Sequence, residues 1–513
     1  MSPKTWLPDW SHYPEQLTPL SATVWFEAIG HGIHESMRTL RGPFGGFEAR
    51  TDAGWAYEGE LEPEWEPEAG ALRRAALDLP RVWDAELRPR AHAITAELHA
   101  LRPERAGSPD VRSLFDRMWS LVLEQWVLHF LAVIPAQAGI EMAFDAYRDD
   151  QDKTDPLAPY RLLDGPNETM EADAALRHMA DRARELDLAD IVSAYPVEVV
   201  TDRLRELGSG REWLHELDAY LRHYGGRARL HELSLPREVE QPRMTFESLR
   251  LFLESGDRSA PTPTHVDGVP EASSALADML SSARFCYALK ENHVYHIDYP
   301  GLLATREVLL GFGRRLLAEG LLASTDDVWM LRRTELRDVL VGEGTPDLHP
   351  LIQERRSELA DGLVRGPKPY LGDPPEERKR DALLEKFYGH GGGRGRPDFL
   401  QGEGASPGSA EGVARIVVGP DDFQRVRAGD VVVALTTTPA WTPLFSSLAA
   451  LVTETGGVLS HAAIVAREYQ LPAVVGAQGA TRLIPDGARL LVDGAAGTVT
   501  VLTASGSGDS DGH

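Results

Sequence analysis

Cysteine is nearly absent from this chain of 513 residues, since Cys286 is its one example. A single thiol excludes an intramolecular disulfide framework and any zinc site built from several thiolates. Chains of this kind suit a reducing compartment. The cysteine content therefore favours a cytoplasmic protein.

Basic residues are scarce relative to acidic ones. The chain carries 53 Lys and Arg against 79 Asp and Glu, which gives a formal net charge of −26 at pH 7. A protein with this excess of negative charge repels the phosphate backbone of a nucleic acid. We therefore expect no nucleic-acid partner.

Long apolar runs are also lacking. The first residues, MSPKTWLPDWSHYPEQ, contain no apolar segment after a basic start, as a signal peptide would require. The longest apolar stretch, WVLHFLAVIP at residues 126–135, is too short to span a bilayer and carries His129. We expect a soluble cytoplasmic protein with no membrane partner.

Helical periodicity dominates residues 1–365. Apolar residues recur at three- and four-residue spacing in 84–104 and 111–148, which gives each helix one buried stripe. Another helix is predicted to begin at Thr169, with acids in its first turn and arginines later. Residues 325–340 read as a short strand followed by a helix. The pattern predicts a large, mostly helical region.

Glycine and proline concentrate in residues 366–403, which predicts a flexible linker. Beyond it, the runs ARIVVG, DVVVAL, LAALVTE, LPAVVG, ARLLVDG and GTVTVL are bounded by Gly, Pro or Asp and predict six strands. We thus predict a multidomain α and α/β fold: a helical substrate-binding region at 1–365, possible subdomains within it, and a small α/β domain at 404–503. The polar tail at 504–513 is expected to be disordered.

The segment TETGGVLSHAAIVAREYQLPAVVG, residues 453–476, carries the sharpest functional signal. A strand runs into two glycines, and His461 then opens a helix. A helix N-terminus offers free N–H groups and positive partial charge to an anion, and imidazole can accept a phosphoryl group and pass it on. On this segment alone, an ordinary helix-capping or surface histidine stays the alternative.

The last hundred residues resemble the mobile phosphohistidine "swivelling" domain of the phosphoenolpyruvate-utilising enzymes. The resemblance covers 404–502 and includes GASPGSAEGVARIVVG, TTTPAWTPLF, the histidine segment and VDGAAGTVTV. It implies that His461 is the phosphorylated residue. It also assigns the histidine loop to Thr455, Gly456, Gly457 and Ser460, and the end of the motif to Arg467.

Residues 14–370 resemble the helical substrate-binding region of proteins of the rifampin phosphotransferase type. The segments LLDGPNETMEADAALRHMADRARE, LRHYGGRARLHELSLPR and ENHVYHIDY carry this resemblance. Gly226 stands where those relatives commonly have a histidine, and His223 is the nearby candidate to substitute for it. The sequence leaves no room for an ATP-grasp domain or a phosphoenolpyruvate-binding barrel. We therefore expect no metal or cofactor on this chain itself, with ATP and Mg²⁺ bound by a separate ATP-grasp partner.

The segment KENHVYHIDY at residues 290–299 supplies candidate acid–base groups. These are Glu291, His293, His296 and Asp298. In a helix His293 and His296 would lie on neighbouring faces, whereas in an extended segment His296 and Asp298 would share one face. A polar cap over a helix packing is the alternative role.

Two charged residues flank the Gly-Gly turn. Arg227 and Glu232 are candidates to bind a phosphoryl group or a substrate hydroxyl, and a structural salt bridge is the alternative. His31 and His34 have a spacing seen in metal sites, but no carboxylate motif accompanies them. The sequence therefore predicts no metal site.

Three functions fit these residues. In the first, His461 receives a phosphoryl group from an ATP-grasp protein, swings on the linker and phosphorylates a hydroxyl of a small organic alcohol. In the second, the chain is a lyase that dehydrates a hydroxylated molecule, with or without transient phosphorylation. In the third, it is a regulatory or scaffold protein. The residues favour the first, and they do not identify the substrate.

Overall fold

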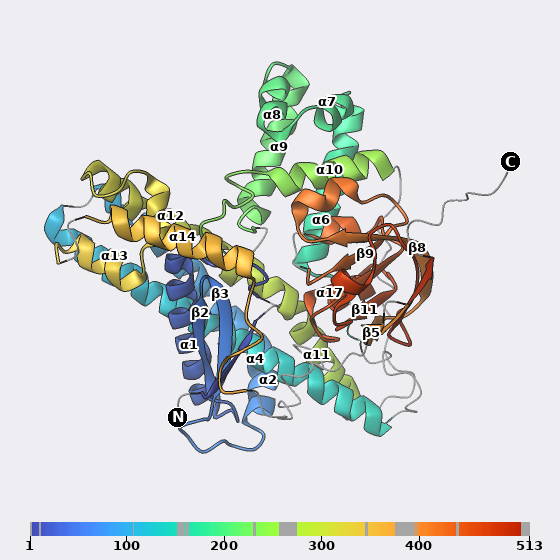
Figure 1. Cartoon of the computed structure of the whole chain (residues 1–513). Helices are drawn as coiled ribbons and strands as arrows, with labels where there is room; N and C mark the ends of the chain where they lie inside the picture. Colours follow the sequence, from blue (N-terminus) through green and yellow to red (C-terminus); the bar gives the residue numbers. More distant parts are fainter. Residues whose placement is uncertain are drawn as a thin grey trace. The chain divides into compact units, whose positions relative to one another are not determined.

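The computed structural model describes most of the chain, namely residues 3–9, 12–105, 107–150, 160, 163, 165–228, 232–255, 274–343, 347–374, 395, 396, 398–437 and 441–503. The chain forms two compact units. Unit 1 comprises residues 1–142, 230–236 and 292–378, and unit 2 comprises 143–229, 237–291 and 379–513. Figure 1 labels their elements. The predicted domain boundaries at 365 and 403 stay a prediction, and the predicted tail at 504–513 lies outside the described residues.

Unit 1 is mainly helical, as predicted. The predicted helix at 84–104 is the π-helical turn η1 (Trp83–Leu87) followed by α3 (Arg88–Ala100), and the one at 111–148 lies within α4 (Ser108–Asp150). The other helices are α1 (Pro19–Leu40), α2 (Ala71–Val82), α12 (Tyr299–Ala318), α13 (Arg333–Leu340) and α14 (His349–Arg365).

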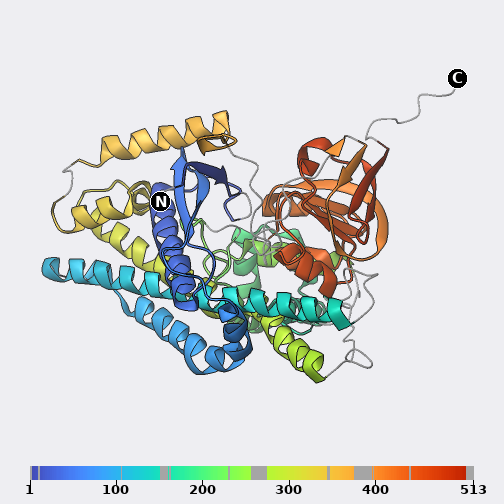
Figure 2. The same ribbon diagram turned by 90° about the horizontal axis from the view of Figure 1, so that it is seen from below.

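Unit 1 also contains a four-stranded antiparallel sheet that the sequence analysis did not predict. Its order is β2 (Gly46–Asp52), β3 (Trp55–Leu61), β1 (Thr5–Pro8) and β4 (Leu371–Gly372). Ala53 and Gly54 both have positive φ, of 48° and 83°, which is the conformation of a type I′ hairpin turn. Helix α1 packs against β2 (Figure 2, blue).

The strand predicted within residues 325–340 is wrong. Residues Thr325–Met330 form the 3₁₀ helix η4, because Ser324 and Asp327 make a capping box in which the Asp327 carboxylate accepts the Ser324 N–H at 2.8 Å. The buried apolar run from Val328 to Leu331 led to the prediction of a strand, because a short apolar run fits a strand and a buried helical segment equally well. The helix predicted to follow is confirmed as α13.

One group of helices in unit 2 packs around a core that includes Trp213 and Phe246. These helices are α6 (Glu168–Glu185), α7 (Ala189–Ala194), α8 (Val197–Arg205), α9 (Gly208–Tyr224) and α10 (Arg243–Ser255). Helix α11 (Ser274–His293) belongs to unit 2 as far as Glu291. Helix α6 begins one residue before the predicted Thr169. Its N-cap is Asn167, whose side chain accepts the Met170 N–H at 3.0 Å.

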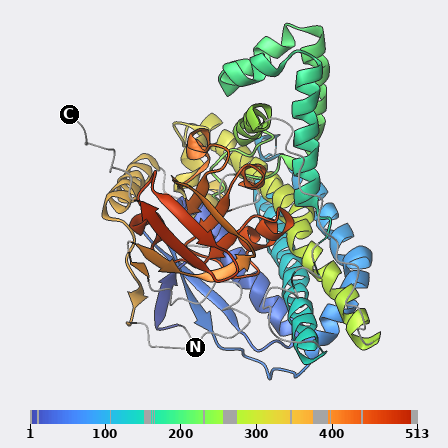
Figure 3. The ribbon, with the colours of Figure 1, turned by 90° about the vertical axis from the view of Figure 1, so that its right-hand side faces the viewer.

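The C-terminal part of unit 2 is a nine-stranded sheet in the order β5-β6-β13-β12-β8-β9-β10-β11-β7. The six predicted strands are confirmed (Figure 3, orange to red). They are β8 (Ser409–Val417), β9 (Val431–Ala434), β10 (Ala450–Thr453), β11 (Ala473–Val475), β12 (Arg489–Asp493) and β13 (Thr498–Thr503). Three further strands were not predicted from the sequence, namely β5 (Gly395–Arg396), β6 (Phe399–Gln401) and β7 (Glu403–Ser406).

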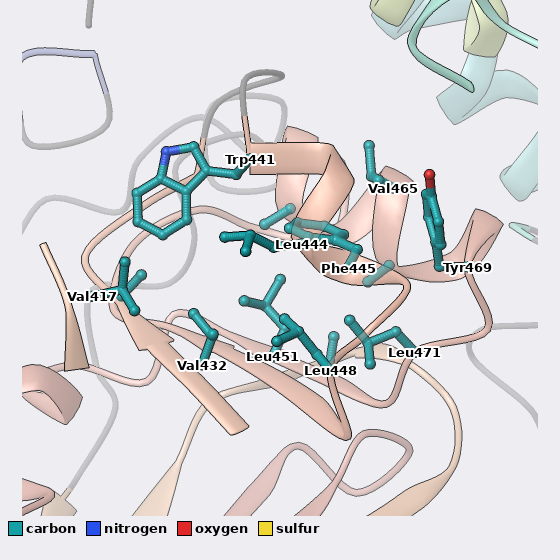
Figure 4. Close-up of a cluster of buried hydrophobic side chains, with 14 of the residues drawn as sticks. Val417, Val432, Trp441, Leu444, Phe445, Leu448, Leu451, Val465, Tyr469 and Leu471 are labelled. Atoms are coloured by element: carbon teal, nitrogen blue, oxygen red, sulfur yellow. The ribbon is translucent and has the colours of Figure 1, made fainter. Parts of the chain in front are cut away.

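Two short helices cover one face of this sheet. They are α16 (Thr442–Phe445) and α17 (His461–Glu468). Figure 4 shows the side chains of the strands and helices packed together in one buried cluster. Burial of Phe445 and Val465 against Leu451 fixes α17 beside the carboxyl end of the parallel strand β10. His461 is therefore held at an edge where α/β sheets bind ligands.

One described segment, Asp110–Tyr147 of α4, is long and apolar enough to cross a membrane. However, 56% of its most apolar window is buried inside the protein. Burial of this kind is what a core helix of a soluble protein requires. The length and apolar composition of this segment are therefore only weak evidence that it crosses a membrane.

A charged cluster in unit 1 predicts a pH-dependent stability. The Asp9 carboxylate accepts a hydrogen bond from His12 Nδ1 at 2.7 Å. Burial lowers the pKa of His12, but Asp9 outweighs it and brings that pKa to about 9 from 6.5. Burial, with Asp9, raises the pKa of Glu58 from 4.5 to about 8. Both groups thus hold their proton more tightly in the folded state, so their stabilisation is present at low pH and is lost as pH rises through those values.

We expect the free energy of unfolding to fall between about pH 4.5 and about pH 9, through Glu58 up to about pH 8 and through His12 from about pH 6.5 upward, as measured by urea denaturation. His12→Gln should weaken this dependence, whereas His31→Gln, at an exposed position of α1, should not. A profile that is equally flat in wild type and His12→Gln would contradict the assignment.

Candidate functional site

The loop before α17 is held by its own backbone. The Thr455 N–H and hydroxyl both donate to the Leu435 carbonyl oxygen, at 3.0 and 2.9 Å. Ser460, the N-cap of α17, donates its N–H to the Gly457 carbonyl oxygen at 3.0 Å. His461 follows as the first helical residue, as predicted. The loop thus fixes where the imidazole leaves the backbone.

Gly456 is required by conformation and by space. Its φ is +91°, and a Cβ at this position would lie 2.9 Å from the Cβ and Oγ of Ser460. Only glycine adopts this backbone conformation at low cost. Any side chain here would displace the residue that precedes His461.

Gly456→Ala is therefore expected to distort the loop that positions His461, in addition to lowering the free energy of unfolding. Gly429→Ala is the matched control, because Gly429 has a similar φ of +87° but an added Cβ would meet nothing within 4 Å. Both variants should lose about 1 kcal/mol or more in urea denaturation. Only Gly456→Ala should also reduce phosphorylation of His461, and equal phosphorylation of the two variants would contradict the expectation.

The imidazole of His461 is oriented by a carboxylate from α11. His461 Nδ1 lies 2.9 Å from Glu291 Oε2, and the two side chains are 14% and 5% exposed. The Thr169 hydroxyl donates to the same carboxylate oxygen at 3.0 Å. Since an ionised carboxylate only accepts hydrogen bonds, the proton of a neutral imidazole sits on Nδ1. The lone pair then lies on Nε2.

His461 Nε2 is the reactive atom that this geometry leaves available. It is buried, and it has no hydrogen-bond partner among the described residues. The hydroxyl oxygen of Ser460 is also buried without a hydrogen-bond partner among the described residues, and it does not cap α17. Unsatisfied buried polar atoms are rare, and here they gather at a helix N-terminus whose partial charge favours an anion. The arrangement suits a nucleophilic nitrogen that receives a phosphoryl group.

Arg467 connects the histidine loop to its surroundings. Its guanidinium donates to the carbonyl oxygens of Ala405 at 2.7 Å and Val458 at 2.9 Å, and to the Tyr287 hydroxyl at 3.1 and 2.9 Å. It also lies 4.4 Å from the ring centre of Tyr160. The side chain is buried, so these contacts make it a positioning residue for the loop.

The buried carboxylate of Asp173, on α6, forms a second connection to the end of α17. Tyr469, the residue after α17, donates its hydroxyl to Asp173 Oδ2, and Arg177 Nε donates to the same atom at 2.9 Å. Burial raises the pKa of Asp173, and burial together with Asp173 raises that of Tyr469. The tyrosine therefore stays protonated and keeps donating this bond at neutral pH.

The structure divides the predicted 290–299 cluster into three parts. Glu291 faces His461, as described. His296 Nδ1 lies 3.2 Å from His92 Nε2, and its ring packs on Trp83. His293 and Asp298 face the same way because Val294–Asp298 form the π-helical turn η3. The extended alternative, which put His296 and Asp298 on one face, is therefore wrong.

His129 was not predicted as a site residue, yet it joins His293 and Asp298. Its Nδ1 lies 2.8 Å from Asp298 Oδ1, and His293 Nε2 lies 3.6 Å from Asp298 Oδ2. The signal in the sequence was the one imidazole inside the apolar run at 126–135. A buried polar side chain needs a partner, so this histidine pointed to a polar contact inside the helical region.

Arg227 and Glu232, which follow the Gly-Gly turn, make hydrogen bonds to other residues of the protein. Arg227 is buried and donates to the Tyr220 hydroxyl at 2.7 Å. Glu232 lies in the other unit and accepts hydrogen bonds from Thr18 Oγ1 at 2.9 Å and the Ser234 N–H at 2.8 Å. His223 is exposed at the end of α9. The roles predicted for these residues in binding substrate stay predictions.

Comparison with known proteins matches two segments of the chain to family models. Residues 426–497 match the mobile domain of PEP-utilising enzymes, and residues 129–292 match the fourth domain of rifampicin phosphotransferase. The resemblance predicted from the sequence is thereby confirmed for both segments. The small α/β domain that carries His461 is thus similar to the mobile domain of PEP-utilising enzymes.

Longer relatives extend this similarity over most of the chain. Chondramide synthase cmdD of Chondromyces crocatus is 30% identical over 97% of this chain, and this match covers 14% of the synthase. The uncharacterized phosphotransferase YvkC of Bacillus subtilis is 28% identical over 76% of this chain and 49% of its own length. The rifampicin phosphotransferase of Streptomyces sviceus is 29% identical over 62% of this chain and 39% of its own length. The chain thus spans less than half of each relative.

Proposed function

We propose that this chain is the phosphohistidine component of a phosphotransferase. His461 Nε2 accepts a phosphoryl group from an ATP-grasp partner and transfers it to a hydroxyl of a small organic molecule. The observation that carries the proposal is the Glu291–His461 pair, which leaves a nucleophilic Nε2 at the N-terminus of α17. Similarity to proteins named as phosphotransferases supports it.

In the first step, the Nε2 lone pair forms an N–P bond while the P–O bond to the nucleotide breaks and the nucleotide leaves. The imidazole becomes positively charged as this bond forms. Glu291, 2.9 Å from Nδ1, stabilises that charge, and the first turn of α17 stabilises the phosphoryl oxygens. Thr169 keeps the carboxylate in place through its 3.0 Å hydrogen bond.

In the second step, the oxygen of the acceptor hydroxyl attacks phosphorus and the N–P bond breaks. The electron pair of that bond returns to Nε2, and the hydroxyl proton passes to a base. The phosphoramidate bond is high in energy, so transfer to an alcohol is favourable. The step requires in-line alignment and charge neutralisation more than covalent chemistry by the acceptor site.

The burial of Nε2 makes movement part of this proposal. Nε2 is enclosed, so a nucleotide can reach it only after the groups that cover it move, while Nδ1 stays bound to Glu291. After the first step the domain at 404–503 swings to the acceptor hydroxyl, and residues 366–403 supply the length of chain for this movement. An ATP-grasp partner and a cytoplasmic location belong to the same proposal.

Incubation with ATP, Mg²⁺ and a co-encoded ATP-grasp protein tests it. The full chain should gain phosphate that is labile in acid and stable in base, and peptide mapping should place it on His461. His215→Gln is the control, because His215 is an exposed histidine of α9 with no assigned role and should leave the label unchanged. Phosphate elsewhere, or dehydration of a hydroxylated substrate by this chain without nucleotide, would overturn the proposal in favour of the lyase.

A further inference from the structure

Three metal-ligating side chains meet inside unit 1. His129 comes from α4, His293 ends α11, and Asp298 ends η3. One ligand atom from each residue lies within 4.8 Å of the other two. The side chains are largely buried, with exposures of 14% for His129, 8% for His293 and 13% for Asp298. This cluster has no role in the chemistry of His461 described above.

A π-helical turn builds this cluster. In an α-helix, residues five apart are separated by about 140° around the axis, so His293 and Asp298 would point to different sides. In η3 the Tyr299 N–H instead bonds the Val294 carbonyl oxygen, five residues back, and the two side chains share a face. Isolated π turns are rare and are frequently found at functional sites. The backbone here departs from regular α-helix geometry, and this departure places His293 and Asp298 next to each other.

The spacing of the three side chains fits a transition-metal ion. Ligands about 2.0 Å from a tetrahedral zinc ion lie about 3.3 Å from one another. His129 Nδ1 lies 2.8 Å from Oδ1 of Asp298 and His293 Nε2 lies 3.6 Å from Oδ2, and one ligand atom from each residue lies within 4.8 Å of the other two. Small side-chain rotations would therefore bring all three into coordination. Two imidazoles and a carboxylate suit zinc or iron(II) and not Mg²⁺, which prefers oxygen ligands.

The surroundings hold the ligands rigidly. The ring of His129 packs 4.8 Å from Trp126 and 4.7 Å from Phe130, measured between centroids. Gln125 Nε2 donates to the Ile297 carbonyl oxygen at 3.1 Å, which fastens η3 to α4. Gly301 leaves no room for a side chain against Gln125. Neighbours of this kind fix the orientation of metal ligands, and an apolar wall limits the access of water.

We propose that His129 Nδ1, His293 Nε2 and one carboxylate oxygen of Asp298 bind a divalent transition-metal ion. Three protein ligands leave at least one coordination position open. Its use rests on the proposed function: this position would hold an oxygen ligand such as the acceptor hydroxyl, and the metal would make the proton of that hydroxyl easier to lose. The metal site itself does not depend on that use.

Calorimetric titration of the full, chelator-treated chain with ZnCl₂ tests the proposal. We expect tight one-to-one binding in wild type, at least about 100-fold weaker binding in His293→Gln and Asp298→Asn, and no competition by MgCl₂. Co²⁺ should give the visible absorption of a low-coordinate site. Circular dichroism verifies that both variants are folded. No binding by wild type, or unchanged binding by the two variants, overturns the proposal.

Two further variants make the test specific. His296→Gln removes the neighbouring pair with His92, and it should still bind zinc. Loss of binding in this variant alone would place the metal at that pair and overturn the assignment. His461→Ala should bind zinc as wild type does. Zinc binding without phosphohistidine formation would reject the proposed function alone, and the reverse result would reject the metal site alone.

Discussion

Replacement of His461 by alanine is expected to remove all phosphate that is labile in acid and stable in base, and to lower phosphoryl transfer by at least about 10³-fold. The reason is geometric. Nε2 of His461 is the nitrogen that the Glu291 contact leaves with a lone pair, at a helix end that favours the phosphoryl oxygens. Radiolabel retained after base treatment measures the loss.

His461→Asn separates the loss of the nucleophile from a loss of structure. An asparagine amide can still donate a hydrogen bond toward Glu291, but it has no nucleophilic nitrogen. Both variants should therefore lack phosphate, while the asparagine variant keeps a melting temperature closer to wild type. Phosphate on either variant would mean that another residue carries the group.

Glu291→Gln is expected to slow phosphoryl transfer by about 100-fold while leaving the fold intact. The amide oxygen of glutamine can accept the hydrogen bond from Nδ1, so the ring keeps its orientation. The negative charge that stabilises the imidazole cation is lost, and the N–P bond forms less readily. Single-turnover labelling with ATP and the ATP-grasp partner measures this rate.

Thr169→Val is the graded control for Glu291. It removes the 3.0 Å hydrogen bond from the Thr169 hydroxyl to the carboxylate but keeps the charge. We expect a loss of about 10-fold or less, smaller than that of Glu291→Gln. Equal rates for wild type and Glu291→Gln would contradict the role assigned to the carboxylate.

The sequence was informative about the C-terminal fold because its parallel strands are buried on both sides. Strands such as β9 and β10 consist of consecutive apolar residues and are visible without knowledge of their partners. The pairing of β1 with β4 in unit 1 could not be predicted in this way. Strand β1 is short, and it pairs with β4 more than 360 residues away, Thr5 opposite Gly372. No local pattern encodes such a pairing.

The residues around His461 likewise fall into those that the sequence could predict and those that it could not. His461 could be predicted because the glycines, the N-cap and the histidine are neighbours in the chain. Its partner could not, since Glu291 lies 170 residues away. Glu291 and His293 were grouped by proximity in sequence, but η3 and the fold send them to different partners. A π turn has no periodic signature that separates it from an α-helix.

The decisive measurement is which nitrogen of His461 bears the phosphoryl group. The full chain, labelled with ¹⁵N in its histidines, is phosphorylated with ATP and the ATP-grasp partner, and proton–nitrogen correlation spectra of His461 are recorded. The account predicts a phosphoryl group on Nε2, with Nδ1 protonated toward Glu291. A phosphoryl group on Nδ1 would contradict it, because that nitrogen is the one 2.9 Å from the carboxylate.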